Sequence, residues 1–326
     1  MEDAFDRLRG DRKDIIVIVL WCLGIGVIVC WVALTLRSDT RQDSLYNLTA
    51  ILQAAPVKSG ESFRADLPFY NRVMFPLAHR GFSQAFPALS PEQWYVYLKL
   101  ASYQAAFLAF ALVCHLSLRT PRSVTGLATA ILALAIIAGF NHPWDEPSDA
   151  LDLVALALGV GAILRQRFIL CLVLAVVFAT NRDSAAFLGV AWFVLLATKQ
   201  DGLRRAVEGA VIFAGSYATA LSLRWILAPH AIAHFNTQAV NVRSLLEAFT
   251  SFNPLSWLVV LAASFLLFLP FLNFARPLAG RFVAVAMLLA LPTISFGLIN
   301  EVRVFLPTFA FLALAVAASL EESASG

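Results

Sequence analysis

The chain has 326 residues, of which 60% are hydrophobic and only 14% are charged. In water this composition would leave large apolar patches exposed, so it excludes an ordinary soluble domain and indicates lipid as the main solvent. The formal net charge of +3 is spread over the short segments between apolar stretches. It gives no argument for nucleic-acid binding.

The apolar stretches predict transmembrane helices, because about 20 apolar residues cross a hydrocarbon core of about 30 Å. In chain order the long stretches are 15–36, 94–118, 124–140, 150–164, 206–227, 255–274, 281–299 and 304–320. Two shorter runs, 168–180 and 185–198, are separated by Asn-Arg-Asp-Ser. A backbone break at membrane depth is tolerated only inside protein or beside a watery cavity. We therefore expect an all-α, polytopic bundle of about ten spans, with residues 1–326 forming a single integral membrane domain.

The basic residues predict the orientation, because short cytoplasmic loops retain lysine and arginine. With the tail 1–14 in the cytoplasm, the basic residues on the inner side are Arg7, Arg9, Arg12, Lys13, Arg119, Arg122, Arg165, Arg167, Lys199, Arg204, Arg205, Arg276 and Arg281. An even number of spans places the C-terminus in the cytoplasm as well. The alanine-rich composition favours a bacterial cytoplasmic (inner) membrane. No small-residue cleavage site follows the first helix, so we expect it to be retained as an anchor.

The cysteines lie inside apolar stretches and lack the spacing of a zinc site. They are Cys22, Cys30, Cys114 and Cys171. We predict that all of them pack in the interior as small apolar residues.

Two outer segments are long, 37–93 and 229–254, and long loops usually carry function or are disordered. The first contains recurring aromatic residues and prolines, which predict short interfacial helices lying along the membrane. In the second, His230 and His234 have a spacing that suits a metal, but no third ligand is obvious, and a structural role is the better interpretation. We predict no resident metal; a divalent cation is compatible with the outer acids but not required by them.

Asp39 and Asp43 follow the first predicted span and lie on one side if that helix continues for another turn. A carboxylate there is a candidate general base. The alternative is that these acids, beside Arg37 and Arg41, form a solvated helix end.

Arg72 lies between aromatic residues, and Arg80 follows about two helical turns later. An arginine fork binds phosphate oxygens, while aromatic rings pack an attached chain or a sugar face. Arginines that reach from an interface toward water give the same pattern.

The densest acidic cluster spans 141–152 and offers six candidates for sugar or acceptor binding. They are His142, Trp144, Asp145, Glu146, Asp149 and Asp152. Such a group can position a sugar, hold a divalent cation or tune a base. Acids also cap helices, and Asp149 and Asp152 stand at a predicted helix start, where the dipole favours them.

Two further turns, 181–184 and 300–303, each place an arginine and an acid at the outer end of a helix pair. Their candidate residues are Asn181, Arg182, Glu301 and Arg303. Ionisable residues near membrane depth are costly and are functional candidates by default. The alternative is that they form internal salt bridges that tie helix ends together.

The order of these motifs resembles the polytopic membrane glycosyltransferases of the GT-C superfamily, in particular a poorly characterised bacterial branch. The matching segments are Asp43-Ser-Leu-Tyr46, 68–78, 143–152, 181–184 and 301–307. They cover nearly the whole chain, although each motif is short. The chain departs from better-known members in having no large C-terminal soluble domain and no clear Asp-Asp or Asp-Glu pair in the first outer loop.

The resemblance implies inverting transfer of a sugar from a polyprenyl-phosphate donor to a cell-envelope glycan or lipid acceptor at the outer face. The family's catalytic acid carries over best to Asp43 and less well to Asp39. A lipid phosphate leaves readily when cations hold its charge, so Arg72, Arg182 and Arg303 are the candidate phosphate clamp.

Two other functions fit the same residues. A transporter or flippase of lipid-linked glycans also needs ionisable groups and a broken helix near a cavity, although it would favour inverted repeats, which we do not detect. A non-catalytic subunit of polysaccharide assembly predicts that no single outer carboxylate is indispensable.

Overall fold

The computed structural model describes residues 2–36, 74–139, 147–227, 277–296 and 305–324. Within these ranges every regular element is helical, which confirms the all-α prediction. The α-helices are α1 (Glu2–Leu36), α3 (Met74–Ala85), α4 (Pro91–Leu112), α5 (Arg122–Gly139), α6 (Pro147–Leu164), α7 (Phe168–Ala179), α8 (Phe187–Leu196), α9 (Gly202–Leu227), α12 (Pro277–Phe296) and α13 (Leu306–Ala324). A π-helical turn, Val113–Ser117, extends α4, and a 3-10 turn, Asp183–Ala186, precedes α8.

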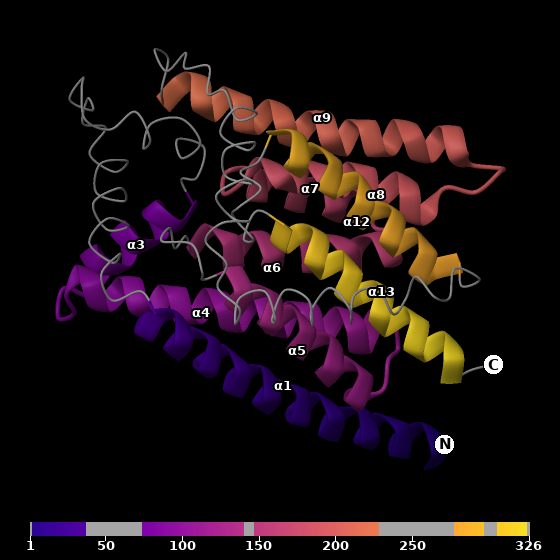
Figure 1. Cartoon of the computed structure of the whole chain (residues 1–326), viewed down its shortest axis with the longest axis horizontal. Helices are drawn as coiled ribbons and strands as arrows, with labels where there is room; N and C mark the ends of the chain where they lie inside the picture. The colour runs from indigo at the N-terminus through magenta and orange to yellow at the C-terminus, as the bar shows by residue number, and fades with distance from the viewer. Residues whose placement is uncertain (1, 37–73, 140–146, 228–276, 297–304, 325–326) are drawn as a thin grey trace, which may run out of the picture.

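Most helices run roughly alongside one another, and the chain passes repeatedly between two ends of the bundle (Figure 1). One end holds both termini and the α4–α5, α6–α7 and α8–α9 connections. We call it the Arg205 end. The other end holds α3, the start of α6 and the α7–α8 turn, and we call it the Arg182 end.

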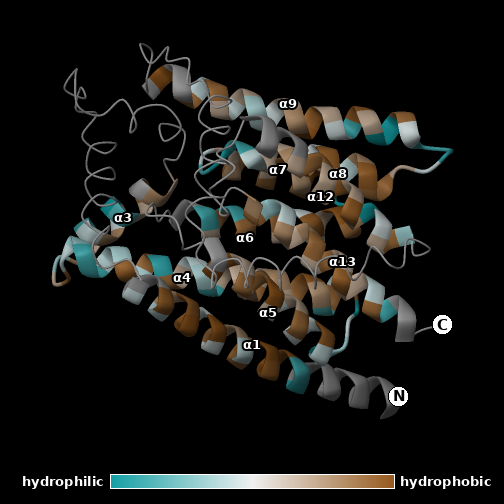
Figure 2. Ribbon diagram, viewed as in Figure 1, coloured by the Kyte–Doolittle hydropathy of each residue, from teal (hydrophilic) through white to brown (hydrophobic). Residues whose placement is uncertain are grey.

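Three helical segments are long and apolar enough to cross a membrane: Lys13–Val32, Pro91–Ser117 and Gly202–Leu223. Apolar residues dominate the middle of the helices, and many of the polar ones gather near the helix ends (Figure 2). The helices α5, α6, α12 and α13 coincide with predicted spans, whereas the predicted span 255–274 lies outside the described residues. α7 and α8 are short, with 12 and 10 residues.

A continuous apolar core joins the helices along the bundle. Its largest fully buried side chains include Phe107 on α4, Trp192 on α8, and Phe282 and Phe311 on α12 and α13. The four cysteines are buried, as the sequence predicted. The Cys22 thiol lies 3.6 Å from the Phe107 carbonyl oxygen, which joins α1 to α4.

Glycines allow the backbones of α8 and α9 to meet directly. A Cβ atom on Gly189 would lie 2.3 Å from the carbonyl oxygen of Gly209 and 2.7 Å from the amide nitrogen of Phe213. Close backbone approach at small residues is the usual way in which helices pack in membranes, where the solvent is as apolar as the side chains. The α7–α8 hairpin therefore sits against α9 without intervening side chains at this level.

The start of α4 explains how α3 is held at the Arg182 end. Ser90 and Gln93 form a reciprocal capping box, and Pro91 occupies the first helical turn. The Nε1 of Trp94 donates to the carbonyl oxygen of Phe86 at 3.1 Å, and the His79 ring lies 2.9 Å from the Pro91 carbonyl oxygen. This places one short helix within the segment 37–93, as predicted.

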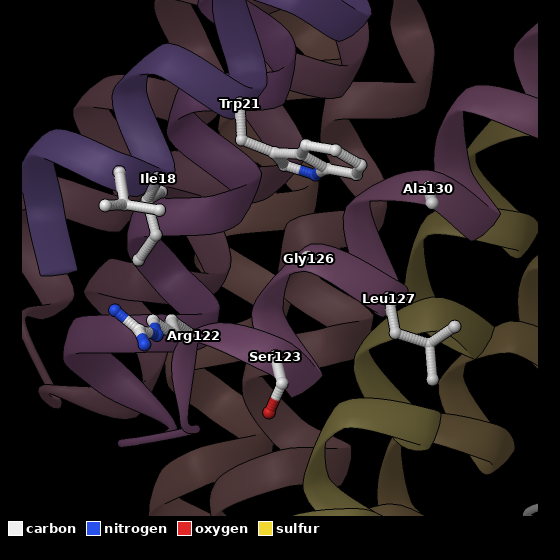
Figure 3. Close-up of a pocket in the computed structure, with 8 residues that line it drawn as sticks. Ile18, Trp21, Arg122, Ser123, Gly126, Leu127 and Ala130 are labelled. Atoms are coloured by element: carbon white, nitrogen blue, oxygen red, sulfur yellow. The ribbon is translucent and has the colours of Figure 1, made fainter.

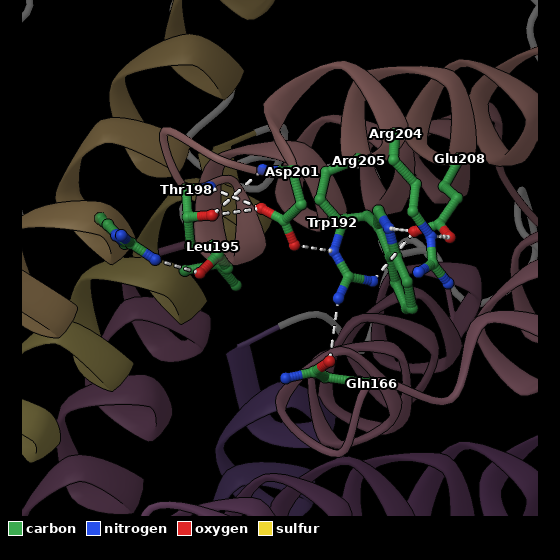
Figure 4. A network of polar contacts seen from close by, with 9 residues as sticks. Gln166, Trp192, Leu195, Thr198, Asp201, Arg204, Arg205 and Glu208 are labelled. Carbon is green, nitrogen blue, oxygen red and sulfur yellow. Dashed lines mark hydrogen bonds and ion pairs between the residues drawn. The ribbon is translucent and has the colours of Figure 1, made fainter.

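A polar network closes the Arg205 end (Figure 4). The Arg205 guanidinium donates to Asp201 at 3.1 Å, to Glu208 at 3.0 Å and to Gln166 at 2.9 Å, and it lies over the Trp192 ring. Gln166, in the turn that follows α6, has a positive φ of 53°, where glycine is the usual residue. The network therefore fixes the α6–α7 turn to the start of α9.

The carboxylate of Asp201, which directly precedes α9, also has a lowered pKa. Hydrogen bonds from the Thr198 side chain and backbone hold the pKa of Asp201 below its usual value. The carboxylate therefore keeps its charge to a lower pH than an unperturbed aspartate does. Because the pKa is lowered, any stability that it contributes is present above the ordinary pKa and is lost only as the pH falls.

The close contact between the α8 and α9 backbones predicts that Gly189→Ala and Gly24→Ala have different effects on stability. Gly189→Ala should lower stability by about 1–3 kcal/mol, because the new methyl group overlaps the α9 backbone. Gly24→Ala, where nothing lies within 4 Å of the new Cβ, should be neutral or stabilising by up to about 1 kcal/mol. Thermal unfolding of both variants in the same detergent measures the difference. Equal melting temperatures would contradict the close α8–α9 approach.

Candidate functional site

The sequence Asn-Arg-Asp-Ser forms a tight turn between α7 and α8. The amides of Asn181 and Arg182 both donate to the Phe178 carbonyl oxygen at 2.9 Å, which closes the end of α7. Arg182 then adopts an extended conformation, with φ −159° and ψ 140°, before the 3-10 turn begins at Asp183. The polar residues of the turn are thereby presented at the Arg182 end rather than within either helix.

Two acids on the first turns of α6 face this turn. Asp149 and Asp152 are three positions apart in the sequence, which places them on one side of the helix. Their exposed fractions are only 5% and 2%. Helix capping alone does not require such burial, because capping acids at a helix start are normally solvated.

The turn and α6 meet through two side-chain contacts. Nη1 of Arg182 donates to Oδ1 of Asp149 in a buried ion pair. The Ser184 hydroxyl donates to Oδ1 of Asp152 at 2.6 Å. We call Asp149, Asp152, Arg182 and Ser184 the acid–arginine cluster. It joins residues that are 32 and 33 positions apart in the sequence.

One acceptor in the cluster is left over. Oδ2 of Asp152 is buried and has no hydrogen-bond partner among the described residues. A buried polar atom without a partner costs about 1–3 kcal/mol, and more when it is charged. An ionised carboxylate accepts hydrogen bonds on both oxygens. Within the described residues, this oxygen is therefore a buried acceptor without a donor.

α3 lies beside the cluster. The amide of Met74 lies 3.4 Å from the Thr180 carbonyl oxygen, so the start of α3 touches the α7–α8 turn. The Phe75 ring meets the Tyr95 ring edge to face at 5.9 Å, and Leu151 of α6 packs against this pair. The short helix from the first long loop is thus anchored next to Asp152.

The structure brings together four of the candidate residues: Asp149, Asp152, Asn181 and Arg182. Asn181 is fully buried and Arg182 is 9% exposed. As the salt-bridge alternative predicted, Arg182 forms an internal ion pair, and the structure shows it with Asp149 of the acidic cluster on α6. The candidates outside the described residues are Asp39, Asp43, Arg72, His142, Trp144, Asp145, Glu146, Glu301 and Arg303. His230 and His234 lie outside them as well.

Lys99 is a buried residue that the sequence analysis missed. Its side chain on α4 is 1% exposed and shares a helix face with Tyr95 and Tyr103, which are both buried. The sequence could have indicated Lys99 as a candidate, because a lysine inside the apolar stretch 94–118 is an intramembrane charge by position. In the part of the chain that the structure describes, no group of three or more histidine, cysteine or acidic residues could hold a metal.

No family model matches the chain, and no curated protein and no solved structure is significantly similar to it.

The ion pair predicts a strong and non-additive effect of substitution. Arg182→Met and Asp149→Leu should each destabilise the protein by about 3–5 kcal/mol, because each strands a buried charge. The double variant should cost much less than the sum of the two. Arg204→Met is the matched control, since Arg204 pairs with Glu208 while 72% exposed and should contribute about 1 kcal/mol or less.

Unfolding of all four variants, followed by intrinsic fluorescence in detergent, checks this cycle. Equal destabilisation by Arg182→Met and Arg204→Met would show that the Arg182 contact is not a buried ion pair.

Proposed function

We propose that the protein is an integral membrane protein of about ten spans whose Arg205 end faces the cytoplasm. Three helices have the length and composition of spans, and large apolar side chains such as Leu20, Trp31 and Ile169 are exposed. The connections at the Arg205 end carry Arg119, Arg165, Arg167 and Lys199, which fits the retention of basic residues in the cytoplasm. Both termini lie at this end, which fits an even number of crossings.

In this placement the acid–arginine cluster lies below the outer surface. α7 has 12 residues and therefore rises about 18 Å from the Arg205 end. Asp152 precedes the end of α6 by 12 residues and has a similar height. A hydrocarbon core is about 30 Å thick, so the cluster would be recessed by about 10 Å. Buried ionisable groups at that depth are costly, and they are retained mainly for function.

We further propose that the protein is a membrane glycosyltransferase that uses a polyprenyl-phosphate-linked sugar and a cell-envelope glycan or lipid acceptor. The observation that carries this proposal is the buried cluster of Arg182 with two carboxylates, one of which has an acceptor oxygen to spare. A cation and carboxylates side by side suit a ligand that combines a phosphate with sugar hydroxyls. The motif resemblance supports the same chemistry.

The roles follow from the charges. The acceptor oxygen attacks the anomeric carbon, the bond from that carbon to the phosphate oxygen breaks, and the acceptor proton passes to a carboxylate. Asp43, or less well Asp39, is the proposed base. The leaving phosphate takes the bonding electrons, and Arg72, Arg182 and Arg303 would stabilise its charge.

Within the described cluster, Asp149 positions Arg182 and Asp152 binds substrate. The ion pair to Asp149 holds the Arg182 guanidinium in place, and the guanidinium charge would then stabilise the leaving phosphate. Oδ2 of Asp152 would accept from a sugar or acceptor hydroxyl. The candidates His142, Trp144, Asp145 and Glu146 directly precede α6 in the sequence and would complete the sugar site.

A transporter of lipid-linked glycans is the second candidate, and the broken α7–α8 pair is the observation that favours it. Transporters form midplane sites from discontinuous helices. The two functions differ in outcome, since a transporter binds a lipid-linked glycan and moves it intact.

Transfer from a panel of radiolabelled polyprenyl-phosphate sugars by the purified, reconstituted protein tests the proposal. Asp43→Asn should lower the rate by about 10²–10⁴-fold as the loss of a base. Asp152→Asn should lower kcat/KM by about 10–100-fold, because it weakens a charge-assisted hydrogen bond. Glu92→Gln, an exposed acid at the same end, should be unaffected.

Binding of a lipid-linked glycan without transfer by the wild-type protein would favour the transporter. Full activity of Asp152→Asn would remove the cluster from the substrate site.

A further inference from the structure

A groove lies between α1 and the first half of α5 (Figure 3). The start of α5 is at the Arg205 end of the bundle, whereas α3 and the α7–α8 turn are at the other end (Figure 1). Its volume is about 490 Å³. The lining is formed by Val17, Ile18, Trp21, Arg122, Ser123, Gly126, Leu127 and Ala130. All but Arg122 and Ser123 are apolar or glycine, and these two stand together at the start of α5.

At the base of the groove, Gly126 of α5 lies opposite Trp21 of α1. A Cβ atom on Gly126 would lie 3.7 Å from Nε1 of Trp21, so the indole ring lies close over the α5 backbone. Trp21 is 49% exposed and Leu127 is 45% exposed. The groove therefore combines an open, apolar trough with an aromatic side wall.

Arg122 places a positive charge at the polar mouth of this trough. Its side chain is 61% exposed, and its Nη1 lies 3.4 Å from Oδ1 of Asp14, itself 36% exposed. Such an exposed pair is weak, so the guanidinium keeps donors for another anion. Lys13, also exposed, adjoins Asp14 in the sequence.

We propose that this groove binds an anionic phospholipid of the cytoplasmic leaflet. One acyl chain would lie in the apolar trough against Trp21 and Leu127, and the headgroup phosphate would accept from Arg122 and the Ser123 hydroxyl. The charge at one end and the apolar length behind it match a lipid that has a phosphate at the surface and a chain at depth. The inference rests on the proposed membrane placement but not on glycosyl transfer.

Quenching of tryptophan fluorescence by brominated lipids tests the site in the intact protein. The reporter is Trp21, whose signal is the difference between wild type and Trp21→Phe. In vesicles with equal bromine content, brominated phosphatidylglycerol should quench Trp21 more strongly than brominated phosphatidylcholine. A basic residue near a membrane surface adds about 1 kcal/mol to anionic lipid binding, which is about fivefold in affinity.

Three variants define the headgroup contact. Arg122→Gln should lower the preference for phosphatidylglycerol by about fivefold, and Asp14→Asn should raise it by releasing Arg122. Arg119→Gln is the matched control, because Arg119 is exposed on the same α4–α5 connection but does not line the groove. Gly126→Leu should fill the trough and reduce quenching of Trp21 by both lipids.

An equal response to the two lipids, or a preference that survives in Arg122→Gln, would overturn the proposal. Protection of Trp21 from both lipids would show that protein, such as a second copy of the chain, fills the groove, and would overturn it too. Trp31, which is 65% exposed on the same helix, is the control for the membrane placement. Brominated phosphatidylcholine should quench Trp31 in every variant. If Trp31 is not quenched, α1 does not contact lipid and the membrane placement itself is wrong.

Discussion

The buried ion pair between Arg182 and Asp149 is the interaction on which the Arg182 end depends. An arginine that is 9% exposed is tolerated only with a partner, because the desolvation of a lone charge costs several kcal/mol. Replacement of such a pair by apolar residues of similar volume is often neutral or stabilising. Its presence is therefore explained better by a requirement for charge in this place than by stability.

The rest of the fold can be understood as support for that pair. Glycine-mediated contact between α8 and α9 holds the α7–α8 hairpin, and the Arg205 network fixes the hairpin's other end to α6 and α9. The two short helices are thus restrained at both of their ends. The turn that carries Arg182 consequently has a fixed height relative to Asp149 on the neighbouring helix, and a rigid support of this kind suits a binding site.

The sequence predicted the helices well because apolar run length is a direct signal of a membrane-spanning segment. It also identified Asp149, Asp152, Asn181 and Arg182 as candidates, since charges are conspicuous in an apolar chain.

The sequence could not assign interaction partners to these residues. The contact of Arg182 with Asp149 depends on how α6 packs against α7, which the local sequence of the turn does not reveal. Lys99 lies within an apolar stretch rather than at a helix end, and its burial depends on the face of α4 that meets other helices. The groove beside Trp21 depends on Gly126 of another helix, a pairing that no local pattern reveals.

The proposed function requires that the acid–arginine cluster contacts a lipid-linked sugar. An experimental structure of the protein with a polyprenyl-phosphate sugar bound, in a lipid bilayer, tests it most directly. We expect a ligand hydroxyl within hydrogen-bond distance of Oδ2 of Asp152 and the phosphate against Arg182. A ligand bound away from the Arg182 end, with the cluster unchanged and closed, would show that these buried charges only hold helices together.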